Sequence, residues 1–301
     1  MKTGNMFTKG ALAILLSGGL LFTSCKKENS TASAEVEATV ESTVSDTEAD
    51  GAYDEVFNTT MGIGAEAGGE ELGITAGAGV FAGRMANGDI TGRVDSTQRC
   101  FTVTVFPQIR GVFPKTVTID FGATGCLGRD GKVRKGKIVT VYTGPMRIPG
   151  SKATTEFVGY KVDSVQVQGI YQVENTSTSN NLSLTTKVIN GQLTWDSGRW
   201  VKWTSTRTVI QVEGNGSPMF PLDDIFSITG GGRGENNRGT TWAHEITEPL
   251  IKKFTCRWIS KGVIRFRVNN NTGLLNYGNG DCDNKATLTV NGRTVEITLP
   301  R

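Results

Sequence analysis

Beyond its first hundred residues, this 301-residue chain alternates apolar and polar side chains with a period of two. Phe101, Val103 and Val105 are separated by threonines, and the same alternation returns over 117–121 and 165–173. Successive side chains of a β-strand point to opposite faces of a sheet, so this period predicts strands with one buried face. No long amphipathic helical pattern follows residue 65. We therefore predict an all-β, antiparallel domain.

Asn-Gly pairs supply the turns between these strands. Asn291-Gly292 stands between the alternating segments 288–290 and 295–299, and Asn190-Gly191 has a similar setting. Both residue types tolerate the positive φ that tight hairpin turns require. Short strands joined by such turns favour a β-sandwich-like fold.

Residues 1–24 have the features of a secretory signal peptide. Lys2 and Lys9 precede a short apolar run from Ala11 to Phe22, too short for a typical membrane span. The run leads into Phe22-Thr23-Ser24-Cys25, which resembles the lipobox of bacterial lipoproteins. The resemblance implies cleavage before Cys25, lipidation of its thiol and a membrane as partner. An ordinary signal peptide with an unrelated cysteine is the alternative.

The segment after Cys25 is acidic and poor in core residues. Residues 26–50 consist mainly of Ser, Thr, Ala and acids, and such a composition buries too little apolar area to order itself. We predict that 25–75 is a lipidated cysteine with a flexible acidic tether. A short helix is expected around 52–61, where Tyr53, Val56 and Phe57 have helical spacing. The β domain then covers 76–301.

The charge is unevenly distributed along the chain. Residues 26–71 hold 12 acids and two lysines, whereas residues 72–301 hold 28 lysines and arginines against 17 acids. A basic body predicts an anionic partner such as an acidic polysaccharide, without specific nucleic-acid recognition. Arg134, Lys135 and Lys137 lie in the densest basic run, and we predict them as ligand-binding residues. Solvated strand faces are the simpler interpretation of such runs.

Two cysteine pairs point to an internal duplication. Cys100 and Cys126 are 26 residues apart, as are Cys256 and Cys282, and aromatic-Gly pairs align when the two segments are superposed. We predict related units at 100–144 and 256–300. Four cysteines permit three pairings, and the duplication favours one disulfide within each unit. Each disulfide would stabilise the fold by about 3 kcal/mol. The wide spacings argue against a metal site.

No catalytic residue, metal or cofactor is predicted from the remaining motifs. His244 is the only histidine, so a zinc-protease helix with two histidines is excluded. Gly230–Gly234 lacks the residues of a phosphate loop and is expected to be a flexible connection. The Asn and Asp residues near Cys282 fit ordinary turns better than a Ca²⁺ loop. Asp223 and Asp224 would point to opposite faces of a strand, so a carboxylate pair would have to be assembled by the fold.

Three tryptophans surround an expected hairpin near 196–199. Trp195, Trp200 and Trp203 can stack on sugar rings if they are exposed, although tryptophan on a β domain usually belongs to the core. Trp200 and Trp203 differ by three, so on one strand they face opposite sides. We predict all three as ligand-binding residues and expect at least one to be exposed.

The segments 119–126, 203–208 and 276–287 resemble a family of Bacteroidota outer-membrane lipoproteins. This resemblance implies an outer-membrane, lipid-anchored location, with display at the cell surface, and disulfide bonds, but no activity. We expect a non-catalytic binding or structural component of the cell envelope, with an anionic glycan or envelope proteins as partner. A glycan hydrolase that uses two carboxylates, and a structural subunit of an outer-membrane complex, are the alternatives.

Overall fold

The computed structural model describes residues 26–62, 72, 100–128, 131–178, 181–215 and 221–299. The predicted signal peptide and Cys25 lie outside these residues, as do nearly all of residues 63–99. The sequence-based predictions for those segments therefore stay predictions.

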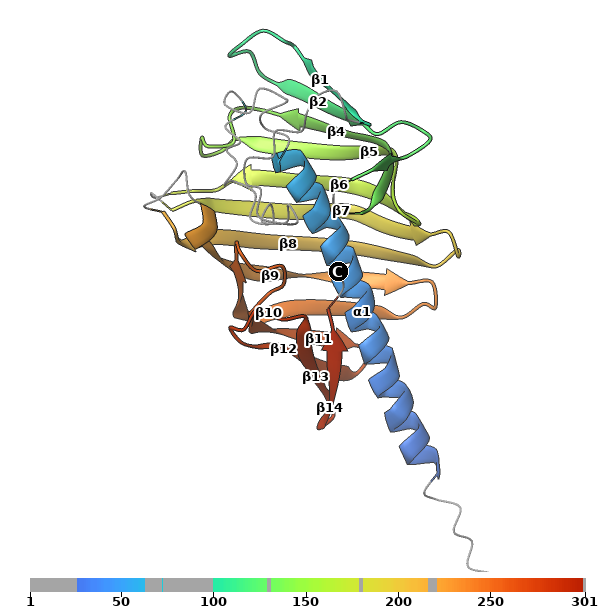
Figure 1. Ribbon diagram of the computed structural model, residues 1–301. Coiled ribbons are helices and arrows are strands. Elements are labelled where there is room, and N and C mark those ends of the chain that lie inside the picture. Colours follow the sequence, from blue (N-terminus) through green and yellow to red (C-terminus); the bar gives the residue numbers. More distant parts are fainter. Residues whose placement is uncertain are drawn as a thin grey trace, which may run out of the picture.

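The described strands form one antiparallel sheet in which nearly every strand pairs with its neighbours in the chain (Figure 1). The order is β1-β2-β4-β5-β6-β7-β8-β9-β10-β11-β12-β13-β14, and β3 pairs with β4. The strands are β1 (Thr102–Phe106), β2 (Lys115–Asp120), β3 (Cys126–Leu127), β4 (Val133–Tyr142), β5 (Lys152–Val162), β6 (Val165–Asn175), β7 (Ser183–Trp195), β8 (Trp200–Glu213), β9 (Ile225–Asn236), β10 (Thr241–Lys253), β11 (Lys261–Val268), β12 (Asn271–Asn279), β13 (Lys285–Val290) and β14 (Arg293–Thr298). The predicted all-β, antiparallel class is confirmed.

The layers differ from the predicted sandwich, because one continuous sheet packs against a helix. Alternation in a strand indicates only that one sheet face is covered, and it does not identify the cover. Here helix α1 (Lys26–Gly62) runs obliquely across that face, and its N-terminal turns extend past the edge near β14 (Figure 1). The helix and the sheet share one core, to which Ala49, Tyr53 and Val56 belong.

The prediction of a flexible tether is therefore wrong for residues 26–62. The buried positions of α1 recur at helical spacing, through Thr39, Thr43, Asp46, Tyr53 and Val56. More than half of the buried residues of α1 are polar, which explains why the composition suggested disorder. The threonine hydroxyls are satisfied locally: that of Thr43 donates to the carbonyl of Thr39 at 2.8 Å. The helix expected near 52–61 is confirmed as the C-terminal part of α1.

The sheet curves around the helix. Tyr142 of β4 donates a hydrogen bond to the carbonyl of Thr60, and the methyl group of Thr39 lies over Gly273 of β12. Those helix positions are about 32 Å apart along the axis, whereas a flat sheet would place β4 and β12 about 38 Å apart. The sheet must bend to bring both strands to the helix.

Bulges in successive strands assist this bending. The register shifts between Lys135 and Lys137 in β4, between Gln168 and Ile170 in β6, and between Val188 and Gly191 in β7. The prediction of a turn at Asn190-Gly191 is therefore wrong, because this pair forms a bulge within β7. Such irregularities bend a strand and increase its twist. The hydroxyl of Tyr53 reaches this region and donates to the carbonyl of Gln168 at 2.6 Å.

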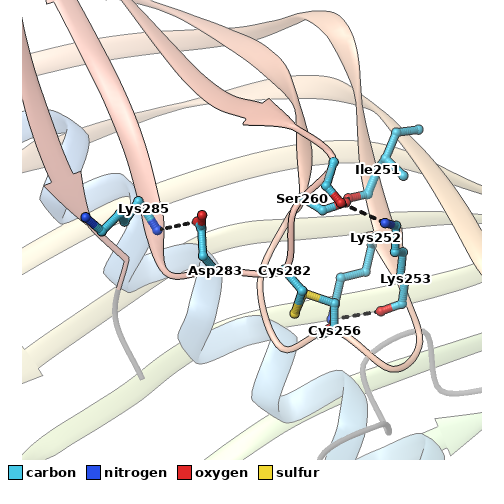
Figure 2. Close-up of a disulfide and its surroundings, with 9 residues drawn as sticks. Ile251, Lys252, Lys253, Cys256, Ser260, Cys282, Asp283 and Lys285 are labelled. Atoms are coloured by element: carbon cyan, nitrogen blue, oxygen red, sulfur yellow. Dashed lines mark hydrogen bonds between the residues drawn. A yellow bond between two sulfur atoms is a disulfide. The ribbon is translucent and has the colours of Figure 1, made fainter.

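Both predicted disulfide pairings are confirmed. Cys100 is bonded to Cys126 and Cys256 to Cys282, and the two bridges lie toward opposite ends of the sheet. Around the second bridge, the backbone N–H of Cys256 donates to the carbonyl of Lys253 at 3.0 Å (Figure 2). The duplication of the two units stays a prediction.

Candidate functional site: the acidic helix on the basic sheet

The carboxylates of α1 face cations that the sheet presents. The ion pairs join Glu41 to Arg238, Asp46 to His244, Glu48 to Arg199, Asp50 to Arg207, and Glu55 to Lys132 and Arg134. They span strands from β4 to β10. The uneven charge suggested an external anionic partner, but five of these lysines and arginines meet the acidic segment of the same chain.

Asp46 is the centre of a buried polar cluster beneath the helix. Its Oδ1 accepts hydrogen bonds from Nε1 of Trp203 at 2.7 Å, from Nε1 of Trp242 at 2.8 Å and from Nδ1 of His244 at 2.8 Å. Burial raises the pKa of Asp46. Attraction to His244 and the hydrogen bonds from His244, Trp242 and Trp203 outweigh that effect, so the pKa lies below its ordinary value. The carboxylate therefore holds three N–H groups from two strands against the helix.

His244 has the environment of a structural residue. Its side chain is fully buried, and its ring lies between Trp203 and Phe266, with centroids 6.2 and 5.8 Å away. Within the described chain, its Nε2 has no hydrogen-bond partner. An Asp–His pair can orient a general base, but that base needs a nucleophile at the second nitrogen. The pair of Asp46 and His244 instead fixes α1 to β10.

Arg207 forms the second buried contact between helix and sheet. It pairs with Asp50 at 2.5 Å, and only 7% of its side chain is exposed. Burial lowers the pKa of Arg207, but the carboxylates of Asp50 and Asp54 outweigh it and raise the pKa above its ordinary value. The guanidinium therefore stays charged, and Asp50 compensates a charge that would otherwise be costly to bury.

The glycine-rich segment is part of strand β9, so the expectation of a flexible connection is wrong. Gly230, Gly232 and Gly234 lie opposite Arg207, Ser205 and Trp203 of β8 on the helix-facing side. A Cβ atom on Gly234 would stand 2.2 Å from the indole ring of Trp242. Gly232 and Gly234 leave room for the rings of His244 and Trp242, which bind Asp46.

The predicted cationic ligand residues do not form one site. Arg134 donates to Glu55 of the helix at 2.7 Å, so it serves an internal contact rather than a ligand. Lys137 pairs with Asp120 at 2.7 Å, and Lys135 is exposed beside it.

The three predicted tryptophans are also separated. Trp203 is buried under α1, which excludes it as a sugar platform. Trp195 packs against the core, with the guanidinium of Arg199 4.0 Å from its ring centroid. Trp200 faces the other side of the sheet, as the spacing predicted, with the ammonium of Lys202 4.9 Å from its ring.

Asp224 is the second carboxylate in a special environment. It follows the short helix η2 (Pro221–Asp223) and accepts a hydrogen bond from Gln211 at 2.8 Å. Burial and then repulsion from Asp223 raise its pKa to about 6, although the bond from Gln211 opposes the shift. The two aspartates lie outside the strands, so the prediction that they face opposite sides of one strand is wrong.

The described residues supply no cluster of three or more His, Cys, Asp or Glu side chains suited to a metal ion. Near Cys282, Asn276 and Asp283 accept the backbone N–H groups of Gly278 and Lys285. This is ordinary turn geometry. Among the described helices, none is long and apolar enough to cross a membrane.

The acidic residues of the helix are the functional residues that the sequence-based prediction missed. Glu41, Glu48 and Glu55 are seven residues apart, while Asp46, Asp50 and Asp54 are four apart. Both spacings repeat on one side of an α-helix. From this regular spacing, an ordered helix with one acidic side and a basic partner could have been predicted.

Comparison with known proteins yields no match among protein-family models, curated proteins or solved structures.

Proposed function

We propose that this protein is a lipid-anchored component of the cell envelope that acts by binding, without catalysis. The observation that carries the proposal is the position of α1. The helix begins at Lys26, directly after the cysteine of the lipobox-like segment, and polar contacts from Glu41 to Glu55 fix it to the sheet. A lipid on Cys25 would therefore hold the β domain through a rigid helix rather than a loose tether.

The contacts of two carboxylates of the helix support binding over catalysis. Asp46 and Asp50 are directed at cations and N–H groups of the sheet. A glycosidase needs two carboxyl groups on either side of an accessible substrate, whereas these two lie between helix and sheet. Such an anchor would be strong enough to keep the protein on the membrane, because a lipoprotein cysteine carries more than one acyl chain and two chains give stable attachment.

Membrane fractionation with labelled palmitate tests the anchor. The wild-type chain should be labelled and should remain with the outer membrane, whereas Cys25→Ser should lose the label and leave the membrane fraction. Ser24→Ala keeps a small residue before the cysteine and serves as the control. Equal labelling and membrane retention of Cys25→Ser would refute the anchor.

A role as a structural subunit is the second candidate, and one surface favours it. Phe106 at the end of β1 is 77% exposed, and Ile109 in the connection between β1 and β2 is 67% exposed. The ammonium group of Lys115 is buried and donates to the carbonyls of Pro107 and Ile109, so this apolar tip is held in place. Cross-linking from a photoreactive residue at position 109 should capture an envelope protein if the tip is an interface.

A hydrolase is the remaining alternative, and the raised pKa of Asp224 is the feature that favours it. An Asp224→Asn variant would lose any glycan hydrolysis that depends on this carboxyl. Equal hydrolysis by wild type and variant would exclude Asp224 as the acid.

A further inference from the structure

No described segment outside the sheet is seen to cover the face opposite α1 over β8 to β11, where side chains of Lys202, Arg233 and Arg267 are exposed. Along β8, Val201, Trp203 and Ser205 are buried toward the helix, so Trp200, Lys202 and Thr204 point the other way. The strand registers continue this face through Arg233 of β9, Ala243 of β10 and Arg267 of β11, all three exposed. We call Trp200, Lys202, Arg233, Ala243 and Arg267 the outer patch.

Two arginines of the outer patch flank a small residue. Ala243 is paired with Arg233 on one side and with Arg267 on the other. Their Cα atoms are therefore two strand spacings apart, about 10 Å. The methyl group between them leaves space for both guanidinium groups to approach one anion. Within the described part of the chain, neither arginine forms an ion pair, in contrast to Arg207 and Arg238 on the side of the helix.

The acids of this face leave the two arginines available. Glu245 accepts a hydrogen bond from Arg265 at 2.6 Å. That bond and the charge of Arg265, and to a lesser degree the charge of Arg267, keep the pKa of Glu245 below its ordinary value. Glu235 is the other neighbouring acid, and it lies opposite Lys202 rather than between the arginines.

Trp200 adds an aromatic surface to these cations. It is partly exposed on the same face, with the ammonium of Lys202 4.9 Å from its ring. Trp200 lies four residues from Thr204, the partner of Arg233, which corresponds to about 13 Å along the strand. The outer patch therefore offers an aromatic ring at one end and paired guanidinium groups at the other, on a surface long enough for a short oligosaccharide.

We propose that the outer patch binds an acidic oligosaccharide, with Arg233 and Arg267 on its anionic group and Trp200 against a sugar ring farther along the same oligosaccharide. Arginine recognises planar carboxylates, and tetrahedral oxyanions such as phosphate or sulfate, by donating two parallel hydrogen bonds to a pair of oxygen atoms. Aromatic rings pack against the apolar faces of sugars. This inference names the ligand class of the binding role proposed above.

The test is a binding titration of the purified full chain in detergent with three oligosaccharides of similar length. Oligogalacturonate supplies carboxylates, a heparin-derived fragment supplies sulfates, and maltohexaose is neutral. We expect at least one acidic ligand to bind tightly and maltohexaose to bind at least tenfold more weakly. The two acidic ligands distinguish carboxylate from sulfate recognition. Affinity should fall as salt is raised, because the contacts are exposed and charged.

The variants locate the site. Arg233→Ala/Arg267→Ala should weaken acidic binding at least tenfold. Lys152→Ala/Lys285→Ala removes two cations from the same face outside the patch, and it should change affinity less than twofold. Ala243→Glu places a carboxylate between the arginines and should abolish binding, while circular dichroism confirms that each variant is folded.

Two results would overturn the assignment. One is an absence of acidic-ligand binding by the wild type, and the other is an equal loss in the arginine and lysine double variants. Either result leaves the palmitate and fractionation experiment unaffected, so failure of the outer patch is distinguishable from failure of the anchored-protein proposal.

Discussion

Removing the carboxylate of Asp46 should detach the helix from the sheet. Asp46→Ala leaves three buried N–H donors, from Trp203, Trp242 and His244, without their shared acceptor. An unsatisfied buried donor costs about 1–3 kcal/mol, so the sum is about 3–9 kcal/mol before water enters the site. The whole free energy of unfolding of a domain is about 5–15 kcal/mol. We expect a loss of about 4 kcal/mol, and roughly half of that for Asp46→Asn, which keeps an acceptor oxygen without the charge.

Urea unfolding followed by circular dichroism measures this loss, and hydrogen exchange of residues 39–57 reports the helix directly. Glu37→Ala is the matched control, because Glu37 is an exposed acid of the same helix, and it should change stability by less than about 0.5 kcal/mol. A loss below about 1 kcal/mol with unchanged helix exchange would refute the role of Asp46.

Acid should weaken the same contact in the wild type. The pKa of Asp46 is lower in the folded chain than its ordinary value of 3.8. Its stabilising contribution is therefore complete above about pH 4 and is lost as the pH falls through the folded pKa. Asp46→Asn should remove this part of the acid dependence, which urea titrations at pH 2–5 would measure.

Three further predictions concern backbone, covalent and ionisable features. Gly234→Ala should lower the free energy of unfolding in urea by several kcal/mol, because its Cβ would meet an indole ring at 2.2 Å. Gly51→Ala has no atom within 4 Å of the new Cβ and should stabilise the helix by about 1 kcal/mol. A more stable Gly234→Ala than Gly51→Ala would contradict this packing. Replacing Cys256 and Cys282 together by serine should remove about 3.5 kcal/mol by chain entropy, and a calorimetric melting temperature equal to that of the wild type would contradict this. The pKa of Asp224 is raised to about 6, so its ionised form opposes folding and stability should rise as the pH falls from 6 toward 4. Asp224→Asn should flatten that slope, and an unchanged pH dependence of the melting temperature would argue against the shift.

Local regularities in the chain were enough for much of the fold. Alternation around Phe101 and Val117 predicted strands, because each side chain of a strand reports the face on which it lies. The equal spacing of the cysteine pairs predicted both disulfides. The three-residue offset between Trp200 and Trp203 predicted that they face opposite sides, which is confirmed.

Composition misled the interpretation of the helix and the glycines. The segment containing Thr39, Thr43 and Asp46 has few apolar residues, but the side chains of these three residues are satisfied within the helix or by donors from the sheet. Burial of such groups costs little once every hydrogen bond is made. Gly232 and Gly234 indicated flexibility, although they leave room for rings from the neighbouring strand.

The amino-acid pattern alone established the strand-rich class, the turn at Asn291-Gly292, the disulfide pairs and the separation of acidic and basic segments. Only the tertiary structure decided that the acidic segment covers the basic sheet, and which cations remain on its open face. Arg207 and Arg233 are the same residue type, but Arg207 lies under Asp50 of the helix, whereas Arg233 lies beside Ala243 on the exposed face. Strand periodicity assigns side chains to one face or the other, whereas the partner of each face is set by contacts between residues more than a hundred positions apart.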